Sequence, residues 1–343
     1  MLFNKNDKAV SPVVATLVLI VVAIIGAAAV GALLGAFSGN VGNQANAQGT
    51  STASSTTLSV VGSTTMQPAS EKLATAYEGN HQGVQINVQG GGSGAGITAV
   101  GQKIADIGSS SRAIKDPEMA TYPTLQSFEV GACAAVFIAN TGATVTGATQ
   151  AQLSTAFSAI TATSTVGGAT VTVHGRSDSS GTKDVVMSWL GSANTPAAPI
   201  TQGTGVITVP GSQAVEDAVA TDTAGGIGYV DFGFAVNDPR VQMLPITATY
   251  DVVNRKVLGS GGVAKAFTAA TTFTPTSDNI LTELKTSGTA VGTKYPEGLI
   301  QPLFYITNGA PNTLQKSFID FARSPDGSAI LNKDNYFGVT QYK

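Results

Sequence analysis

Residues 176–182 have the composition of an anion-binding loop. They read Arg-Ser-Asp-Ser-Ser-Gly-Thr and follow a β-branched run, Ala169–Val173, which predicts a short buried strand. The apolar residues after the loop recur at helical spacing and predict a helix: Val185, Val186, Trp189 and Leu190. Because a helix N-terminus presents unpaired N–H groups and a partial positive charge, this strand–loop–helix segment can bind an anion.

The side chains of this loop fit that chemistry. Arg176 can supply a forked, permanent positive charge, and Gly181 lets the backbone approach a bound ion. Ser180 and Thr182 add hydroxyl donors. Asp178 would repel an anion unless it pairs with Arg176 and orients the guanidinium. The plainer alternative is a serine-capped helix after a polar loop.

Two loops nearer the N-terminus repeat the arrangement. Each lies between a strand candidate (Leu58–Val61 or Val84–Val88) and a helix candidate, so its hydroxyls would stand at a helix start. Their residues are Ser63, Thr64 and Thr65 in the first loop, and Ser93 and Gly94 in the glycine run 90–96. This run lacks the Gly-Lys-Ser/Thr of nucleotide phosphate loops and does not fit Gly-x-Gly-x-x-Gly, so nucleotide binding is not predicted.

Together these loops resemble the periplasmic phosphate-binding proteins of ABC transporters. The Ala-Asp-Ile-Gly run at 105–108, which leads to Ser111-Arg112, and the Gly-Ile-Gly-Tyr-Val strand at 226–230 are similar to segments of that family. The resemblance covers most of residues 58–343. It implies an α/β, type II periplasmic-binding-protein fold in which residues 58–138 and 234–343 form lobe I and residues 139–233 form lobe II.

The resemblance also implies a ligand and a partner. Inorganic phosphate would bind between the lobes, and an ABC transporter permease would receive it. The implied contacts are Ser63, Thr64, Thr65, Ser93, Gly94, Arg112, Arg176, Asp178, Ser180, Gly181 and Thr182. A phosphate-selective site also needs a hydrogen-bond acceptor for the ligand's own proton. Arg112 cannot accept, so we expect discrimination against sulfate to be weaker than in a carboxylate-bearing site.

Composition excludes several other classes. The chain has 343 residues, of which 11% are charged, with a net charge of −3 and no basic patch, so nucleic acid is not expected as a partner. Two histidines and one cysteine do not favour a zinc site or a histidine-based catalytic triad. We therefore expect no cofactor, no metal and no enzymatic activity.

The N-terminus predicts a membrane anchor. Residues 10–37 are apolar and uncharged, and Lys5 and Lys8 precede them, so 1–37 is interpreted as a signal or transmembrane segment with its N-terminus in the cytoplasm. The run Lys8–Val14 resembles the N-termini of archaeal type IV pilin-like proteins. A cleaved secretory signal is the competing interpretation. Residues 38–57 are expected to be a flexible linker, which would place residues 58–343 at the cell surface.

Three alternatives remain open from the residues. The chain could be a pilin-like structural subunit that displays an anion-binding domain. It could bind another oxyanion such as sulfate, molybdate or tungstate, or it could act on phosphate esters through Ser93 or Ser180. Residues 250–292 show weak periodicity and are expected to form a loop region with one short helix, Asn279–Leu284.

The predicted topology can be tested on intact cells. If residues 10–37 span the membrane, protease added outside should remove the domain 58–343, and the protein should sediment with membranes. A domain that resists external protease, or that is freely secreted, would contradict the anchor.

Overall fold

The computed structural model describes residues 56–194, 197–253, 263–286 and 293–343. The transmembrane segment predicted at residues 10–37, the pilin-like run and most of the linker lie outside these ranges. Within them, no helix is both long and apolar enough to cross a membrane. Thr56 and Thr57, expected in the linker, already belong to the first strand, where they pair with Val84 and Gln85.

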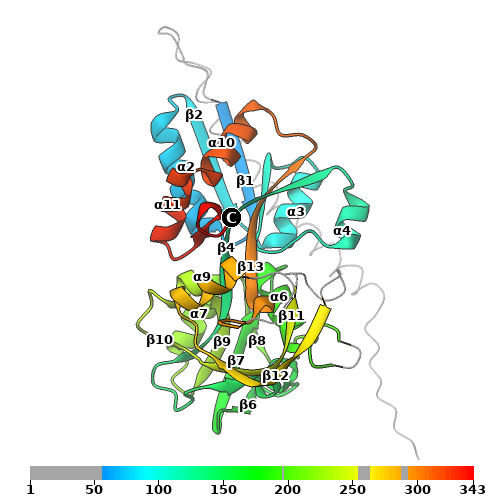
Figure 1. Cartoon of the computed structure of the whole chain (residues 1–343), viewed down its shortest axis with the longest axis vertical. Coiled ribbons are helices and arrows are strands. Elements are labelled where there is room, and N and C mark those ends of the chain that lie inside the picture. Colours follow the sequence, from blue (N-terminus) through cyan, green and yellow to red (C-terminus); the bar gives the residue numbers. More distant parts are fainter. Residues whose placement is uncertain (1–55, 195–196, 254–262, 287–292) are drawn as a thin grey trace, which may run out of the picture. The chain divides into compact units, whose positions relative to one another are not determined.

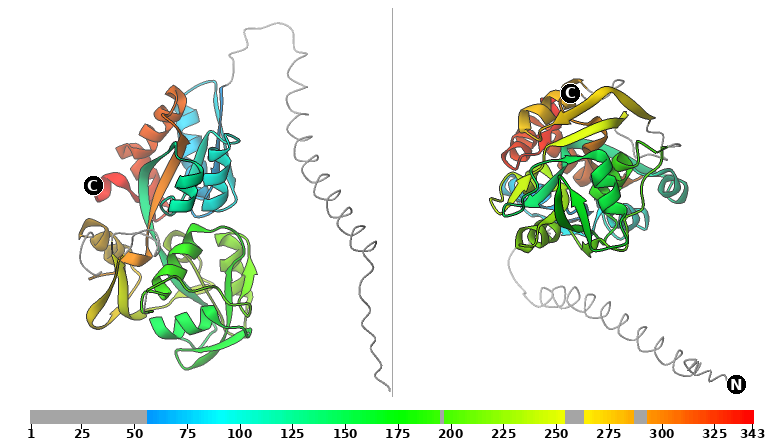
Figure 2. Two further views of the ribbon diagram at one scale, coloured as in Figure 1. Left: turned by 90° about the vertical axis from the view of Figure 1, so that its right-hand side faces the viewer. Right: turned by 90° about the horizontal axis from the view of Figure 1, so that it is seen from below.

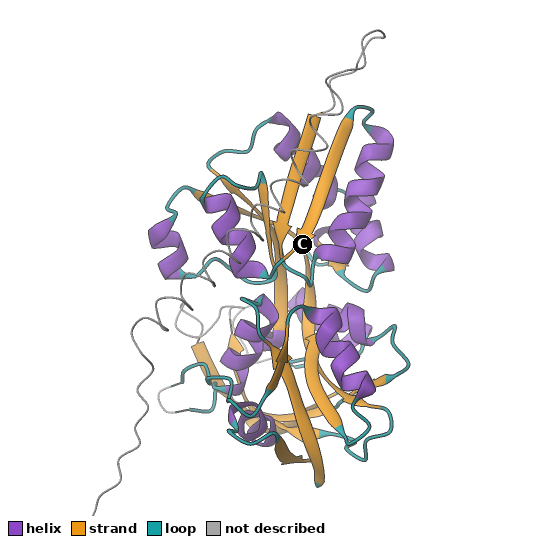
Figure 3. Ribbon diagram, turned by 180° about the vertical axis from the view of Figure 1, so that it is seen from behind, coloured by secondary structure: helices purple, strands orange, loops and turns teal. Residues whose placement is uncertain are grey.

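Strands and helices alternate along much of the described chain (Figures 1 and 3). The strands are β1 (Thr56–Gly62), β2 (Val84–Gly90), β3 (Ile107–Ser110), β4 (Leu125–Asn140), β5 (Ala148–Thr149), β6 (Thr163–Val166), β7 (Ala169–Arg176), β8 (Ile207–Val209), β9 (Gly226–Asp231), β10 (Val241–Met243), β11 (Ile246–Val253), β12 (Val263–Phe273), β13 (Ile300–Asn308) and β14 (Phe337–Gly338). The helices are α2 (Gln67–Asn80), α3 (Ser93–Gly101), α4 (Asp116–Thr121), α5 (Gln150–Ser158), α6 (Gly181–Leu190), α7 (Ser212–Thr221), α8 (Phe232–Ala235), α9 (Ser277–Thr286), α10 (Thr313–Arg323) and α11 (Pro325–Lys333), with 3₁₀ turns η1 (Glu297–Leu299) and η2 (Val339–Gln341).

One mixed sheet runs through both lobes. Its main path in the described residues is β2-β1-β3-β13-β4-β9-β7-β6, and a separate sheet has the order β12-β11-β5. β1 is parallel to β2 and β3, whereas β4 is antiparallel to both β13 and β9. This α/β architecture agrees with the expected fold class.

Two antiparallel strands, β4 and β13, connect the lobes. The two strands pair at Ala134–Ile300 and at Gly131–Leu303, and along this stretch they run from one hydrophobic core to the other. Residues 132–139 of β4 are all at most 1% exposed, as expected for a strand with both faces covered. Figure 1 shows β4 and β13 side by side between the two groups of elements.

Each lobe has its own hydrophobic core. The first is built around Leu73, Tyr77, Tyr305 and Phe318, and Tyr77 packs edge-on against Phe318 at 5.4 Å between ring centroids. The second is built around Phe137, Phe157, Trp189 and Tyr229. Leu73 and Tyr77 are four residues apart on α2, so they lie on the same, buried face of this helix.

The chain returns to lobe I later than the sequence predicted. Residues 234–343 were all expected there, but Ile246, Phe273 and Ile280 pack in the core that contains Phe137 and Trp189. The chain passes to the other core along β13, which begins at Ile300 in this core and continues to Leu303 and Tyr305 in the other. The yellow hairpin of β11 and β12 accordingly lies with the green elements of lobe II (Figure 2).

Residues 250–292 also contain more regular structure than expected. β11 pairs with β12 from Ile246–Phe273 to Val253–Val263, with one irregularity between Ala248 and Tyr250. The sequence concealed β12 because most of its residues are exposed and do not alternate between polar and apolar. The predicted helix is present as α9 and extends beyond Asn279–Leu284 in both directions.

We predict that Gly96→Ala destabilises lobe I. A Cβ atom at Gly96 would lie 2.5 Å from the carbonyl oxygen of Val61 and 2.7 Å from the Cα of Gly62, so α3 would have to move away from β1. We expect a loss of about 1–3 kcal/mol in the free energy of unfolding, measured by urea denaturation.

Gly79→Ala is the matched control. Nothing lies within 4 Å of a Cβ there, and Gly79 is inside α2, so the substitution should be neutral or stabilising by up to about 1 kcal/mol. Equal losses in the two variants would show that the close approach of α3 to β1 does not limit stability.

Candidate anion-binding site

Arg176 is the centre of the site. It is the last residue of β7, and it is 1% exposed. Its Nε and Nη2 atoms donate to the two oxygens of Asp178 at 2.7 and 2.5 Å, Nη2 also donates to Thr64 Oγ1 at 2.7 Å, and Nη1 donates to Ser212 Oγ at 3.0 Å. We call these four residues the Arg176 cluster; it joins Thr64 of lobe I to three residues of lobe II.

Asp178 holds the guanidinium as the sequence predicted. Burial acts to raise the pKa of this carboxyl, but the hydrogen bonds and the charge of Arg176 outweigh it and leave the pKa below its ordinary value. The backbone N–H of Gly211 also donates to Asp178 Oδ1, at 3.3 Å. Both oxygens of the carboxylate thus accept hydrogen bonds, and the pairing fixes the plane of the Arg176 guanidinium.

Threonine hydroxyls from the two lobes meet next to the Arg176 cluster. Thr65 Oγ1 and Thr182 Oγ1 are 3.0 Å apart, and Thr182 also donates to Gln301 Oε1 at 3.1 Å. Ser63 lies in the same loop as Thr65, but its hydroxyl accepts from the N–H of Met66 at 3.4 Å and shapes the turn before α2. Thr64 and Thr65 therefore contact residues of lobe II, whereas Ser63 stabilises the turn before α2.

Two glycines allow the loops of the two lobes to touch. The N–H of Gly94 donates to the carbonyl of Ser179 at 3.0 Å, and a Cβ on Gly94 would lie 2.0 Å from Ser179 Oγ. A Cβ on Gly181 would lie 2.5 Å from the hydroxyl oxygens of both Ser93 and Ser111. The predicted residues Ser93, Gly94 and Gly181 are therefore neighbours in the fold.

Four helices begin at this junction. They are α2 after Thr65, α3 at Ser93, α6 at Gly181 and α7 at Ser212. Ser180 caps α6 by accepting from the N–H of Lys183 at 3.1 Å, which leaves its own O–H as a donor. Convergent helix N-termini, hydroxyls and one arginine form an environment for a small anion.

Arg112 makes its contacts outside the Arg176 cluster. Its Nη atoms donate to both oxygens of Glu118 at 2.7 Å, and its Nε lies 2.8 Å from Asp184 Oδ2 on α6. Lys115 is 2.6 Å from the same Asp184 oxygen. Burial opposes the charge of Glu118, but the hydrogen bond from Arg112 lowers the pKa of Glu118 below its ordinary value. This ion-pair group connects lobe I to α6 of lobe II.

Three residues of the site were not recognised in the sequence. Ser212 starts α7 after Gly211, whose φ of +88° a side chain would disfavour; the Pro-Gly-Ser run at 210–212 was an available signal. Ser111 donates its backbone N–H to Ser93 Oγ at 3.1 Å. Asp231, at the end of β9, is fully buried, and burial raises its pKa to about 7.

In the described part of the chain, neither Ser93 nor Ser180 contacts a histidine that could activate it as a nucleophile. Ser93 Oγ lies 3.3 Å from Ser111 Oγ, and Ser180 Oγ caps α6. Each histidine has its contact elsewhere: His81 with the carbonyl of Tyr77 and His174 with Asp222, both at 2.8 Å. The geometry does not favour the phosphate-ester alternative, because a serine nucleophile needs an adjacent base.

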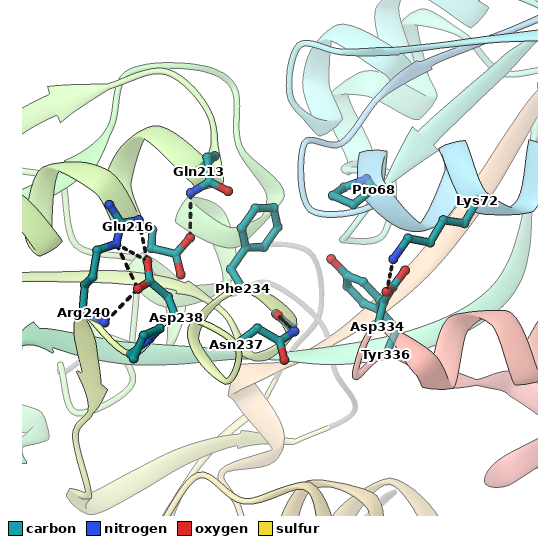
Figure 4. Close-up of a pocket in the computed structure, with 12 residues that line it drawn as sticks. Pro68, Lys72, Gln213, Glu216, Phe234, Asn237, Asp238, Arg240, Asp334 and Tyr336 are labelled. Atoms are coloured by element: carbon teal, nitrogen blue, oxygen red, sulfur yellow. Dashed lines mark hydrogen bonds and ion pairs between the residues drawn. The ribbon is translucent and has the colours of Figure 1, made fainter.

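Two cavities lie between α2 and α7. One of about 500 Å³ is lined by Thr64, Gly211 and Ser212, and so it reaches the Arg176 cluster. The other, of about 410 Å³, is shown in Figure 4; it is lined by Glu216 and Phe234 on one side and by Lys72 and Tyr336 on the other. The larger cavity is therefore the one that borders the Arg176 cluster.

Comparison with known proteins identifies the class. A family model described as the PBP superfamily domain matches residues 47–326, and the chain belongs to this superfamily. The phosphate-binding protein PstS of Bacillus subtilis is 26% identical over 291 residues, which cover 84% of this chain and 82% of that protein. Phosphate-binding protein PstS 2 of Streptococcus pneumoniae is 51% identical over 61 residues, 18% of this chain and 21% of its own length.

Solved structures agree on the fold. A Clostridium perfringens protein crystallised with bound phosphate aligns with a TM-score of 0.62 and 22% identity, covering 83% of this chain and all of the other. An ABC-type phosphate transport receptor of Vibrio cholerae aligns with a TM-score of 0.55 and 21% identity, covering 82% of this chain and 99% of the other. At these identities the likeness establishes the shared fold.

We predict that Glu216→Gln stabilises the protein at high pH. Burial, and then the charge of Asp238, raise the pKa of Glu216 from 4.5 to about 7. A carboxyl with a raised pKa contributes stability below its unfolded pKa and loses that contribution as the pH rises through its folded pKa. The neutral variant should match the wild type near pH 4.5 and exceed it by about 1–3 kcal/mol at pH 8.

Thermal unfolding at both pH values measures this difference. Asp320→Asn, at a half-exposed position on α10, serves as the control and should not reproduce the gain at pH 8. If Glu216→Gln and the wild type unfold at the same temperature at pH 8, Glu216 does not titrate near neutrality.

Proposed function

We propose that this protein captures inorganic phosphate between its two lobes and delivers it to an ABC transporter. The observation that carries the proposal is the Arg176 cluster, in which a buried arginine, oriented by Asp178, meets hydroxyls of both lobes before α2 and at the start of α7. The names of the PstS relatives, which are phosphate-binding proteins, support the choice of ligand.

The donor set suits a dehydrated tetrahedral anion. Each of the four phosphate oxygens can accept several hydrogen bonds, so the site must offer many donors without an excess of positive charge. Arg176 supplies one full charge, while the hydroxyls and helix N–H groups supply dipoles. Proposed contacts are Thr64, Thr65, Ser93, Arg176, Ser180, Gly181 and Thr182, and Ser212 joins them because it already binds Arg176.

Closure of the lobes is the proposed response to the ligand. Loops of both lobes must contribute donors, so binding would favour the arrangement in which Gly94 meets Ser179 and Arg112 meets Asp184. A permease could then distinguish loaded from empty protein by the relative position of the lobes. In this reading Arg112 supports closure rather than contacting phosphate.

We propose membrane attachment through the N-terminus. The uncharged stretch 10–37 after Lys5 and Lys8 would anchor the protein, and the pilin-like run Lys8–Val14 suggests an archaeal surface protein. The linker would allow the domain to reach a permease in the same membrane. A structural role in a filament could coexist with phosphate capture.

Calorimetric titration tests the proposed ligand. The full-length protein in detergent should bind phosphate, and competition with sulfate and molybdate should rank the three oxyanions. Binding of molybdate but not phosphate would assign the site to another oxyanion, and no binding of any of them would contradict the proposal.

We predict that Arg176→Ala abolishes most phosphate binding. Removing the charged donor from a buried site should cost about 2–5 kcal/mol of binding free energy, by analogy with buried charge pairs at interfaces. Asp178→Asn should cost less, because Asp178 acts by orienting the arginine. Arg240→Ala is the control, since Arg240 is half exposed and pairs with Asp217 and Asp238. Near-native affinity in Arg176→Ala would place the site elsewhere.

A further inference from the structure

Asp178 and Asp106, the carboxylates in two of the segments that resemble the family, already have partners. Asp178 accepts from Arg176 on both oxygens. Asp106 accepts the backbone N–H and the hydroxyl of Ser59 at 2.8 and 2.7 Å. Asp178 is therefore not available to accept a hydrogen bond from a protonated oxyanion, which is the feature that separates phosphate from sulfate near neutral pH. Asp106 precedes β3 and so lies at the end of that strand opposite Ser111.

Asp231 is a second carboxyl at the site, and it is under-satisfied. It is fully buried at the end of β9, and its Oδ2 has no hydrogen-bond partner in the described part of the chain. The hydroxyl of Tyr336 approaches Oδ1 at 3.3 Å, but it is closer to the carbonyl of Thr65, at 2.7 Å. Such a carboxyl is energetically unfavourable in either form, because its surroundings do not fully hydrogen-bond the carboxylate or the O–H of the protonated acid.

Thr65 connects Asp231 to the site. The hydroxyls of Thr65 and Tyr336 act on Asp231 as hydrogen-bonding neighbours that lower its pKa. Burial is the larger effect and raises the pKa to about 7. On its other side the Thr65 hydroxyl lies 3.0 Å from that of Thr182, among the proposed phosphate donors. Because a hydroxyl has a single proton, Thr65 can donate toward Asp231 or toward a ligand, but not toward both.

We propose that Asp231, acting through the hydroxyl of Thr65, determines whether the site accepts a protonated or a fully deprotonated oxyanion; this rests on the proposed function. When Asp231 is ionised, Thr65 donates its proton to the carboxylate and offers a lone pair to the ligand, which suits the P–OH of phosphate. When Asp231 is protonated, the carboxyl donates to Thr65, and Thr65 donates to the ligand. Asp231 is thus a positioning residue for the hydroxyl.

Sulfate should therefore bind only when Asp231 has taken up a proton, whereas phosphate carries its own proton into the site. Sulfate has no proton to donate to Thr65, so Asp231 must first take one from solvent. Above the pKa of Asp231 this requirement weakens sulfate binding about tenfold for each pH unit. Monohydrogen phosphate already carries the proton and needs only ionised Asp231, whose fraction rises from about one half at pH 7 to about nine tenths at pH 8. The affinity for this species should therefore rise about twofold over that range.

Four other titratable or charged groups of the described residues lie around Asp231. Burial raises the pKa of Cys133 on β4 and that of Tyr336 after α11, so both remain neutral. Arg176, at the end of β7, contributes a permanent positive charge. Asp334 lies beyond Tyr336, where it pairs with Lys72. The change in charge at this point of the site is therefore that of Asp231.

The experiment is a calorimetric titration of the full-length protein with phosphate and with sulfate at pH 6, 7 and 8. Two buffers with different ionisation enthalpies at each pH give the number of protons taken up. We expect the ratio of sulfate to phosphate dissociation constants to rise about tenfold from pH 7 to pH 8, and sulfate, but not phosphate, to take up close to one proton at pH 8.

Three variants test whether Asp231 and Thr65 cause the pH dependence of sulfate binding. Asp231→Asn offers an amide donor to Thr65, so its sulfate affinity should be independent of pH, with no proton uptake. Thr65→Val keeps the carboxyl, removes the hydroxyl, and should lose the same pH dependence, which gives a second route if Asp231→Asn does not fold. Glu216→Gln removes another carboxyl whose pKa is about 7 but which lines the cavity of Figure 4, and it should retain the wild-type dependence.

The two levels of the proposal fail in different ways. If the wild type binds no phosphate at any pH, the proposed function is wrong. If it binds phosphate, but the sulfate ratio stays constant with pH and no proton is taken up, the role of Asp231 is wrong and the proposed function stands. Retention of the pH dependence in both Asp231→Asn and Thr65→Val would also overturn the role of Asp231.

Discussion

The buried positive charge of Arg176 is the constraint on which the junction between the lobes depends. An arginine that is 1% exposed loses most of its hydration, and it remains compatible with folding because Asp178 neutralises it and two hydroxyls accept from other N–H groups of the guanidinium. Those hydroxyls come from Thr64 of lobe I and Ser212 of lobe II. The hydroxyls that connect the lobes therefore also replace part of the lost hydration of Arg176.

The other charged groups near the junction follow from the same requirement. Arg112 is as buried as Arg176, and it is neutralised by Glu118 from its own lobe and by Asp184 from the other. Asp231 and Glu216 lie in comparable surroundings without a bonded cation, and burial raises the pKa of each to about 7. The arginine partners thus lower the pKa values of Asp178 and Glu118, whereas burial raises those of Asp231 and Glu216 toward neutrality.

Much of the fold could be predicted because strand–loop–helix units are local. The alternation and helical spacing around residues 58–80 and 169–190 predicted β1, α2, β7 and α6 within a few residues. The division into lobes was less accessible, since it depends on which core receives each element. Ile246 and Phe273 lie on strands with little periodicity, and only their contacts with the core around Phe137 assign them to lobe II.

The sequence by itself determined the chemical character of the site. The pairing of Arg176 with Asp178, two residues away, and the hydroxyls at the starts of α2, α3 and α6 are local features that composition and spacing reveal. Only the tertiary structure decided which distant groups complete the site: it directed Arg112 to Asp184, added Ser212, and placed Asp231 behind Thr65. The physical reason is that the charge and proton of a buried group depend on what surrounds it in space, and those neighbours lie far away along the chain.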